Sequence, residues 1–153
     1  MLKVNRKVEY GLVALRHMHA KPRGELTSVR EICDQYGTPF DPVDHVLRIL
    51  NGAGLVKSEQ GAHGGYRLVA DMAAVNFADF IEIIEGRLAF TDCLKGTVVG
   101  CNMREVCNIV SPMHMVHHRL QEFLRSITLE ELIASRPEWM GGEGRPAAAA
   151  AGT

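Results

Sequence analysis

The sequence predicts a mostly α-helical fold with one small β-hairpin. Two observations carry this prediction: apolar residues recur at helical spacing in several segments, and one pair of short strand-like runs flanks a glycine-rich turn. The chain has 153 residues, of which 46% are hydrophobic and 23% are charged. This is the composition of a globular protein, and the length fits one domain or a small domain with a helical extension.

Two helices are predicted in the first part of the chain. The first runs from about Lys7 to His19, with apolar residues every three or four positions, and is expected to pack one face inward. The second follows Ser28, which together with Glu31 forms the pattern of a capping box, and it ends at Gly37.

A third helix is predicted after the short connection 36–39. Asp41 is its expected N-cap, Pro42 suits the first helical position, and Gly52 marks the end. Two short helices joined in this way match a helix-turn-helix, whose second helix enters the major groove of DNA. The third helix is therefore the candidate recognition helix.

A β-hairpin is predicted next, with strands at 55–59 and 66–69 on either side of the turn 60–65. A hairpin directly after a helix-turn-helix is the wing of a winged helix, and a glycine-rich tip can approach a sugar–phosphate backbone closely. Asn76 then caps a fourth helix, residues 77–85.

The predicted domain organisation has four parts. Residues 1–86 form the winged helix-turn-helix DNA-binding domain, and residues 87–111 form a cysteine-containing loop with little periodicity. Residues 112–134 form a long helix, whose apolar stripe indicates a dimer seam, and a short terminal helix after a capping box at Thr128. In residues 135–153 Gly, Pro and Ala are frequent, and a disordered tail is expected.

Charge is unevenly distributed along the chain, although the net charge is only −1. Residues 1–67 carry ten Lys and Arg against seven Asp and Glu, and the remainder carries seven against eleven. The front half is therefore the better candidate for contact with phosphates. The amino-terminal segment has no uninterrupted apolar run, so we expect neither a signal peptide nor a membrane span, and we expect the protein in the cytoplasm.

Three of the four cysteines, Cys93, Cys101 and Cys107, fall within fifteen residues. In a cytosolic chain this clustering favours a metal site over a disulfide framework. An iron–sulfur cluster is the preferred interpretation, and a structural zinc site and three free thiols are the alternatives. Cys33 falls inside the second helix and is interpreted as a small buried residue.

The chain resembles the bacterial Rrf-type regulators, which include IscR-like, NsrR-like and RirA-like iron–sulfur transcription factors. The resemblance covers roughly residues 1–134, and its most specific pieces are residues 49–56, residues 61–66, the cysteine trio and residues 123–129. It implies a homodimer that binds double-stranded DNA at a palindromic operator, with an affinity set by a [2Fe-2S] or [4Fe-4S] cluster on Cys93, Cys101 and Cys107.

The resemblance also bears on the fourth cluster ligand. IscR-like members have a histidine three residues after the last cysteine, where this chain has Val110. Other members use a carboxylate from the first helix of the partner subunit, and the corresponding residue here is Glu9. The implied ligand set is three thiolates and Glu9 of the partner subunit, a weaker ligand for iron than a thiolate. The alternatives are a solvated Glu9, and His114 as the substitute ligand.

Candidate DNA contacts lie on the predicted recognition helix, on the wing and near the amino terminus. Asp44 and His45 can reach base edges, and a carboxylate suits the amino group of cytosine. IscR-like members carry an arginine at the position of Gln60, so Gln60 or His63 would replace it. Arg48 is a further polar residue on the recognition helix. Contacts that position the protein on phosphates are assigned to Lys3, Arg6, Lys7, Arg30 and Lys57.

The sequence therefore predicts a transcriptional regulator that responds to iron, nitric oxide, oxygen or redox potential. A redox-sensing repressor is the expected type. No enzyme is expected, because paired acid–base carboxylates, a nucleophile elbow, a phosphate loop and a dinucleotide fingerprint are all missing from the sequence. Two alternatives stay open: a zinc-stabilised winged-helix protein that docks other proteins, and a small iron–sulfur electron-transfer protein.

Overall fold

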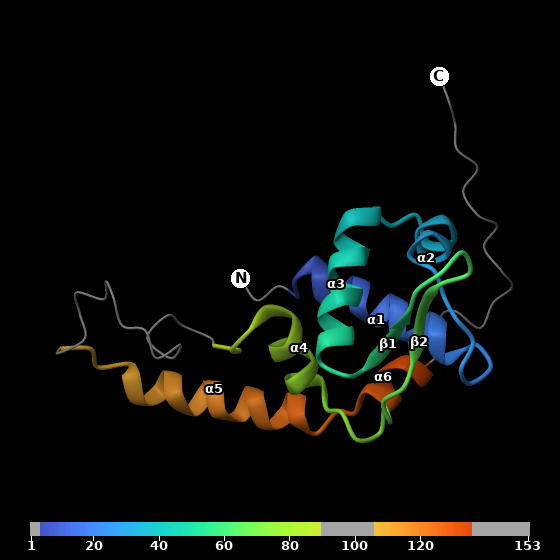
Figure 1. The fold of residues 1–153 in the computed structure, drawn as a ribbon. Coiled ribbons are helices and arrows are strands. Elements are labelled where there is room, and N and C mark those ends of the chain that lie inside the picture. The colour runs from blue at the N-terminus through green and yellow to red at the C-terminus, as the bar shows by residue number, and fades with distance from the viewer. Residues whose placement is uncertain (1–3, 90–105, 136–153) are drawn as a thin grey trace, which may run out of the picture.

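The computed structural model describes residues 4–89 and 106–135. The elements are α1 (Arg6–His19), α2 (Val29–Tyr36), α3 (Phe40–Gly52), β1 (Val56–Glu59), β2 (Gly65–Leu68), α4 (Phe77–Glu85), α5 (Val110–Arg125) and α6 (Leu129–Ala134). Figure 1 shows α1 to α4, the hairpin and α6 gathered in one unit, which we call the head, and α5 projecting from it. The predicted fold class, mostly helical with one hairpin, is confirmed.

One apolar core holds the head together. Fully buried side chains from α1, α3, α4 and α6 meet there, among them Leu15, Leu47, Phe80 and Leu129. Burying a side chain of this size contributes on the order of 1.5–3 kcal/mol. Leu129 belongs to α6, so the chain returns to the head after α5 and completes its core.

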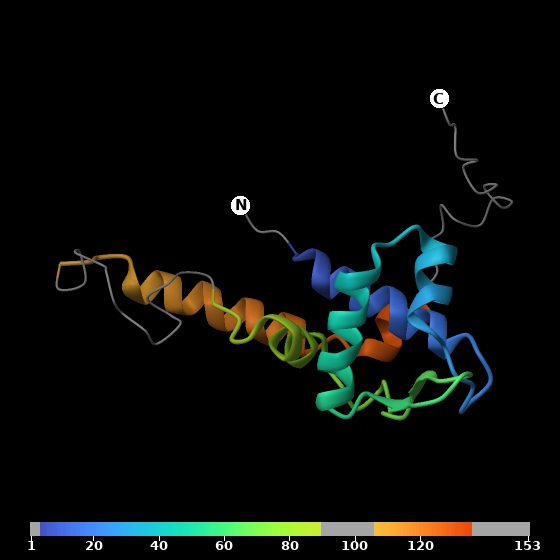
Figure 2. The same cartoon turned by 45° about the horizontal axis from the view of Figure 1, so that its top comes forward.

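Backbone hydrogen bonds fix this return to the head. The Phe77 N–H donates to the Ile127 carbonyl, and the Leu129 N–H donates to the Val75 carbonyl, each at 2.8 Å. The capping box predicted at Thr128 is present. The carboxyl-terminal end of α5 is thus anchored to the head, whereas its amino-terminal end points away from the head in both views (Figures 1 and 2).

Two helices begin at other residues than predicted. Asp41 is not the N-cap of α3, because Pro39 holds an extended backbone (φ −71°, ψ 140°) and the helix starts at Phe40. Asp41 instead lies in the first turn, where the helix dipole favours a negative charge. α5 begins at Val110 and includes Pro112 in its first turn, which is tolerated because first-turn amides have no helical partner.

The hairpin is joined to the segment before α2 as well as being paired internally. The N–H and the carbonyl of Tyr66 both bond to Thr27, each at 2.8 Å. A Cβ atom at Gly65 would stand 2.6 Å from the Thr27 carbonyl oxygen, and one at Gly64 would clash with the Glu59 carbonyl. The paired glycines of the wing are therefore required for space between backbones.

Candidate DNA-binding surface and cysteine segment

The helix-turn-helix is formed as predicted, by α2, α3 and the turn between them. Gly37 ends α2 in the left-handed conformation (φ 64°), and its N–H donates to the Cys33 carbonyl at 2.9 Å. Cys33 itself is only half-buried and packs against the core. Tyr36 and Phe40 flank the turn and are 44% and 49% exposed, which is unusual for aromatic side chains.

On α3 the two predicted polar residues Asp44 and Arg48 bind each other. The Arg48 guanidinium donates to the Asp44 carboxylate at 2.6 Å, and the Arg48 side chain is 72% exposed against 21% for Asp44. Burial and then the Asp44 carboxylate raise the pKa of the nearby Tyr66 hydroxyl, although Arg48 opposes this shift. The Asp44 carboxylate is therefore already paired, and Arg48 and His45 are among the exposed side chains of α3.

The other predicted DNA contacts among the described residues are exposed and lie on several elements. Gln60 and His63 lie in the turn of the wing, Lys57 lies on β1, and Arg30 lies in the first turn of α2. Lys3 lies outside the described residues.

At the start of α1 two predicted functional residues contact each other. Arg6 donates to the Glu9 carboxylate at 2.9 Å, and both side chains are well exposed. Lys7, beside them, is exposed. Surface pairs of this kind contribute about 0–1 kcal/mol, so either residue is available to another partner at little cost.

A partly buried polar network that the sequence did not reveal joins α1 to α2. His17 is 7% exposed, and its Nδ1 lies 3.0 Å from the Tyr36 hydroxyl while its Nε2 lies 2.7 Å from Glu31 Oε1. Lys21 Nζ lies 2.5 Å from the same carboxylate. Burial raises the pKa of Glu31, but the hydrogen bonds from Lys21 and His17 outweigh burial and leave that pKa below its ordinary value.

This network also changes the predicted capping of α2. The Ser28 hydroxyl accepts a bond from the Glu31 N–H at 3.1 Å, as expected. The Glu31 carboxylate, however, turns to α1 instead of completing the capping box. The position of α2 is therefore fixed from α1 by charged and polar contacts in addition to the core.

Of the predicted cluster ligands, the structure describes Cys107 and Glu9. Cys93 and Cys101 lie outside the described residues. Cys107 is half-buried and lies three residues before the first residue of α5, Val110. Within residues 4–89 and 106–135, no three His, Cys, Asp or Glu side chains gather as a metal site.

The side chains of α5 are poorly covered. All residues of α5 belong to the described part of the chain, and none of their side chains is buried. Met115, Val116 and Phe123 are at least one-third exposed. Leu120 and Leu124 line an apolar groove of about 360 Å³, shared with α1 and α4. His114 is exposed, so no contact in the described residues singles it out as a ligand.

The sequence profile of the Rrf2 family, described as an iron-dependent transcriptional regulator, matches residues 4–135. The chain belongs to the Rrf2 family. The match includes the whole head, α5 and the cysteine segment, so the predicted resemblance is confirmed.

Individual Rrf2-type relatives agree with this assignment. The HTH-type transcriptional regulator NsrR of Shouchella clausii is 22% identical over 130 residues, 85% of this chain and 87% of that protein. The structure of CymR, the global cysteine regulator of B. subtilis, has a TM-score of 0.67 at 26% identity and covers 90% of this chain and 100% of its own. T. potens IscR has a TM-score of 0.61 at 28% identity, with 94% of each chain covered.

This Rrf2 chain is therefore a transcriptional regulator of the DNA-binding winged-helix type. The relatives named above are regulators and not enzymes. None of the helices that the structure describes has the length and apolar character needed to cross a membrane.

Proposed function

We propose that this Rrf2 protein is a homodimeric repressor whose affinity for a palindromic operator depends on an iron–sulfur cluster. The observation that carries the proposal is the placement of Cys93, Cys101 and Cys107 in the segment before α5, within a family described as iron-dependent. The signal would be iron supply, nitric oxide, oxygen or redox potential.

The described donors fit such a cluster. Thiolates are its usual protein ligands, and Cys107 is a half-buried free cysteine beside the start of α5. Among the described residues Glu9 pairs only with Arg6 at the surface, so its carboxylate can be recruited. When bound, the cluster supplies redox and ligand-exchange chemistry at the open end of α5.

The fourth ligand is proposed to come from the other subunit. The amino-terminal end of α5 projects away from the α1 helix of its own head (Figures 1 and 2). Glu9 of the partner subunit is therefore the proposed ligand. The exposed apolar side chains of α5 and the groove beside α1 and α4 are the surface that a second copy would cover.

Helix α1 can transmit a displacement at Glu9 to the DNA-binding elements. α1 carries Glu9 near its start and His17 near its end, and His17 bonds to Glu31 and Tyr36 of α2. A displacement of α1 would therefore move the helix-turn-helix.

We propose that Arg48 and His45 read bases, and that exposed Phe40 contacts a thymine methyl group.

Anaerobic purification of the full chain tests the proposal. The protein should be brown and contain iron and acid-labile sulfide, and Cys101→Ala should lose the chromophore and cluster-dependent DNA binding while remaining dimeric. Cys33→Ala is the matched control, since Cys33 lies on α2, and it should keep the cluster. A colourless protein with stoichiometric zinc would refute the cluster and support the zinc alternative.

A further inference from the structure

One side of α3 lies beside the wing. Asp44, Arg48 and Asn51 follow one another at spacings of four and three residues, so they share one side of the helix. The Asn51 Oδ1 atom accepts a hydrogen bond from the Ser58 N–H of β1 at 2.9 Å. Ser58 is the register partner of Tyr66 on β2. This row of polar residues therefore faces the hairpin.

Tyr66 approaches the same row from the wing. Its backbone is held firmly, because its N–H and its carbonyl both bond to Thr27, each at 2.8 Å. Burial and then the Asp44 carboxylate raise the pKa of the Tyr66 hydroxyl, and the Arg48 guanidinium opposes this shift by its charge and by hydrogen bonding. A side chain that is fixed in the wing thus borders the charged pair of α3.

The Asp44–Arg48 pair brings the guanidinium toward the start of α3. The guanidinium donates to the carboxylate at 2.6 Å, and side chains on a helix lean toward its amino terminus. The first turns are the part of a recognition helix that meets base edges. A guanidinium has more N–H donors than one carboxylate can accept, and Arg48 is 72% exposed, so further donors are available to a base.

The orientation of such a guanidinium decides what it recognises. Two parallel N–H groups match the O6 and N7 atoms of guanine, whereas contacts with phosphate oxygens carry no sequence information. An arginine that is already held in one orientation loses less conformational freedom when it binds. Groups that hold the side chain therefore contribute to base preference without contacting the DNA.

We propose that Asp44 and Tyr66 are positioning residues, which hold the Arg48 guanidinium in the orientation that reads a guanine of the operator. Asp44 itself contacts no base, which differs from the contact with a cytosine amino group that the sequence suggested. This role rests on the proposed reading of bases by Arg48.

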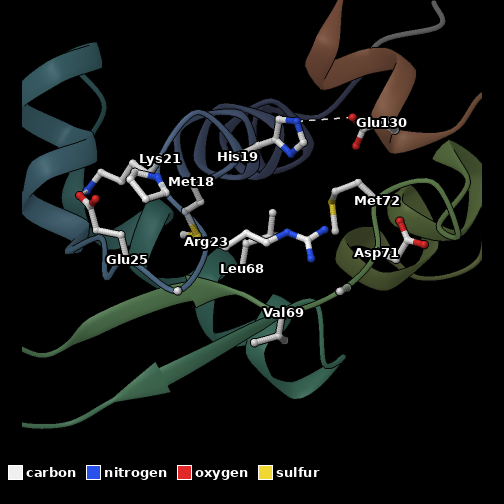
Figure 3. A pocket seen from close by; sticks show the side chains of 13 residues that line it. Met18, His19, Lys21, Arg23, Glu25, Leu68, Val69, Asp71, Met72 and Glu130 are labelled. Carbon is white, nitrogen blue, oxygen red and sulfur yellow. Dashed lines mark ion pairs between the residues drawn. The ribbon is translucent and has the colours of Figure 1, made fainter.

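Another ion pair of the head supplies a control. His19 Nε2 of α1 lies 3.4 Å from the Glu130 carboxylate of α6. Figure 3 shows this pair beside a hollow whose lining, in the described part of the chain, includes no residue of α3. Glu130→Gln therefore removes one carboxylate from an ion pair, as Asp44→Asn does, without altering the recognition helix.

Base preference is measured on the full chain, purified anaerobically. Duplexes are selected from a random library, and the selected duplex is titrated with each base pair changed in turn. The parent protein should select a G·C pair in each half-site whose change lowers affinity at least about fivefold. Arg48→Gln should lose this preference. Asp44→Asn should lose it at the same base pair, and the double variant should lose no more than Arg48→Gln alone, because both changes remove one contact.

Further variants separate positioning from a structural role. Asp44→Glu keeps a carboxylate one turn before Arg48 and should keep the preference. Tyr66→Phe keeps the ring but removes the hydroxyl, and it should weaken the preference at the same base pair at least about twofold. Both Asp44→Asn and Tyr66→Phe should bind a duplex of scrambled sequence as the parent protein does. Glu130→Gln should keep the preference.

Three results would refute the positioning role. A preference lost at a different base pair in Asp44→Asn would mean that Asp44 reads a base itself. An unchanged preference in Asp44→Asn would mean that Arg48 needs no support. An equal loss of affinity for every duplex, selected or scrambled, would mean a structural effect only.

Failure of the proposed function has a different signature. If the parent protein selects no sequence, the proposed function and the positioning role both fail. If it selects a site whose G·C preference is lost in Arg48→Gln but kept in Asp44→Asn, the proposed function stands and only the positioning role fails.

Discussion

The head and α5 differ in how far their side chains are buried. Every helix of the head contributes buried side chains to one core, whereas none of the α5 side chains, in the described chain, is buried. A helix of 16 residues is marginal on its own in water, so its stability depends on packing against something else. The head is thus complete within one chain, and the uncovered side chains of α5 agree with the proposal that this helix is half of a dimer interface.

The largest expected effect is the loss of unfolding free energy when a phenylalanine of the head, rather than one of α5, is replaced by alanine. Phe80→Ala removes a fully buried ring from the head and should cost about 3–5 kcal/mol of unfolding free energy. Phe123→Ala removes a ring on α5 that is 60% exposed and should cost under about 0.5 kcal/mol within a subunit. Chemical denaturation measures the first quantity.

Sedimentation at several protein concentrations completes this comparison. Phe123→Ala should shift the protein toward monomer, and Phe80→Ala should not do so at temperatures where it remains folded. An equal, concentration-independent loss of stability in both variants would show that α5 is no interface.

The next effect concerns DNA reading, which belongs to the head. Arg48→Gln should lower operator affinity by about 1–3 kcal/mol, because it removes an exposed guanidinium from α3. Arg119→Gln, an exposed change on α5, is the control and should leave affinity within about twofold. Electrophoretic mobility shifts at fixed salt measure both, and equal losses would mean that DNA contacts extend along α5.

The smallest effect is a pH dependence within the head. Since the pKa of Glu31 is lowered in the folded protein, its network adds stability above the ordinary carboxyl pKa of about 4.5, and this stability is lost as pH falls through the folded value. Glu31→Gln should therefore be less stable than the parent at pH 7, and the difference should shrink at pH 3. Unfolding free energies at both pH values test this.

Glu122→Gln is the matched control on α5. In the part of the chain that the structure describes, the Glu122 carboxylate forms only an exposed pair with His118 at 3.2 Å, so its replacement should change stability by less than about 0.5 kcal/mol at pH 7. If Glu31→Gln behaves in the same way, the network of His17, Lys21, Glu31 and Tyr36 contributes no more than a surface pair.

Local signals in the sequence were sufficient to predict most helices and the hairpin of the head. Ser28, Asn76 and Thr128 cap the helices they were predicted to cap, because a capping bond spans only three residues. Asp41 failed as a cap because the neighbouring Pro39 imposes its own backbone angle.

Interactions between distant segments could not be predicted in this way. The place of Leu129 in the core depends on residues far away in the sequence, and so does the pairing of Glu31 with His17. The Asp44–Arg48 pair is different, since its spacing of four residues on one helix is a recognisable signal. The assignments of Cys93, Cys101, Cys107 and Glu9 to a cluster stay predictions.

In the described residues α5 is bonded to the head near its carboxyl-terminal end, so a rotation at this junction is amplified along the helix. The 16 residues of α5 extend roughly 24 Å at 1.5 Å per residue. The helix would pivot at its hydrogen-bonded junction with the head. A tilt of about 5° at that junction would carry the far end through roughly 2 Å. A metal–ligand bond tolerates much less than this, so if the proposed cluster forms beside Cys107, a small rotation of the head would be enough to make or break its coordination.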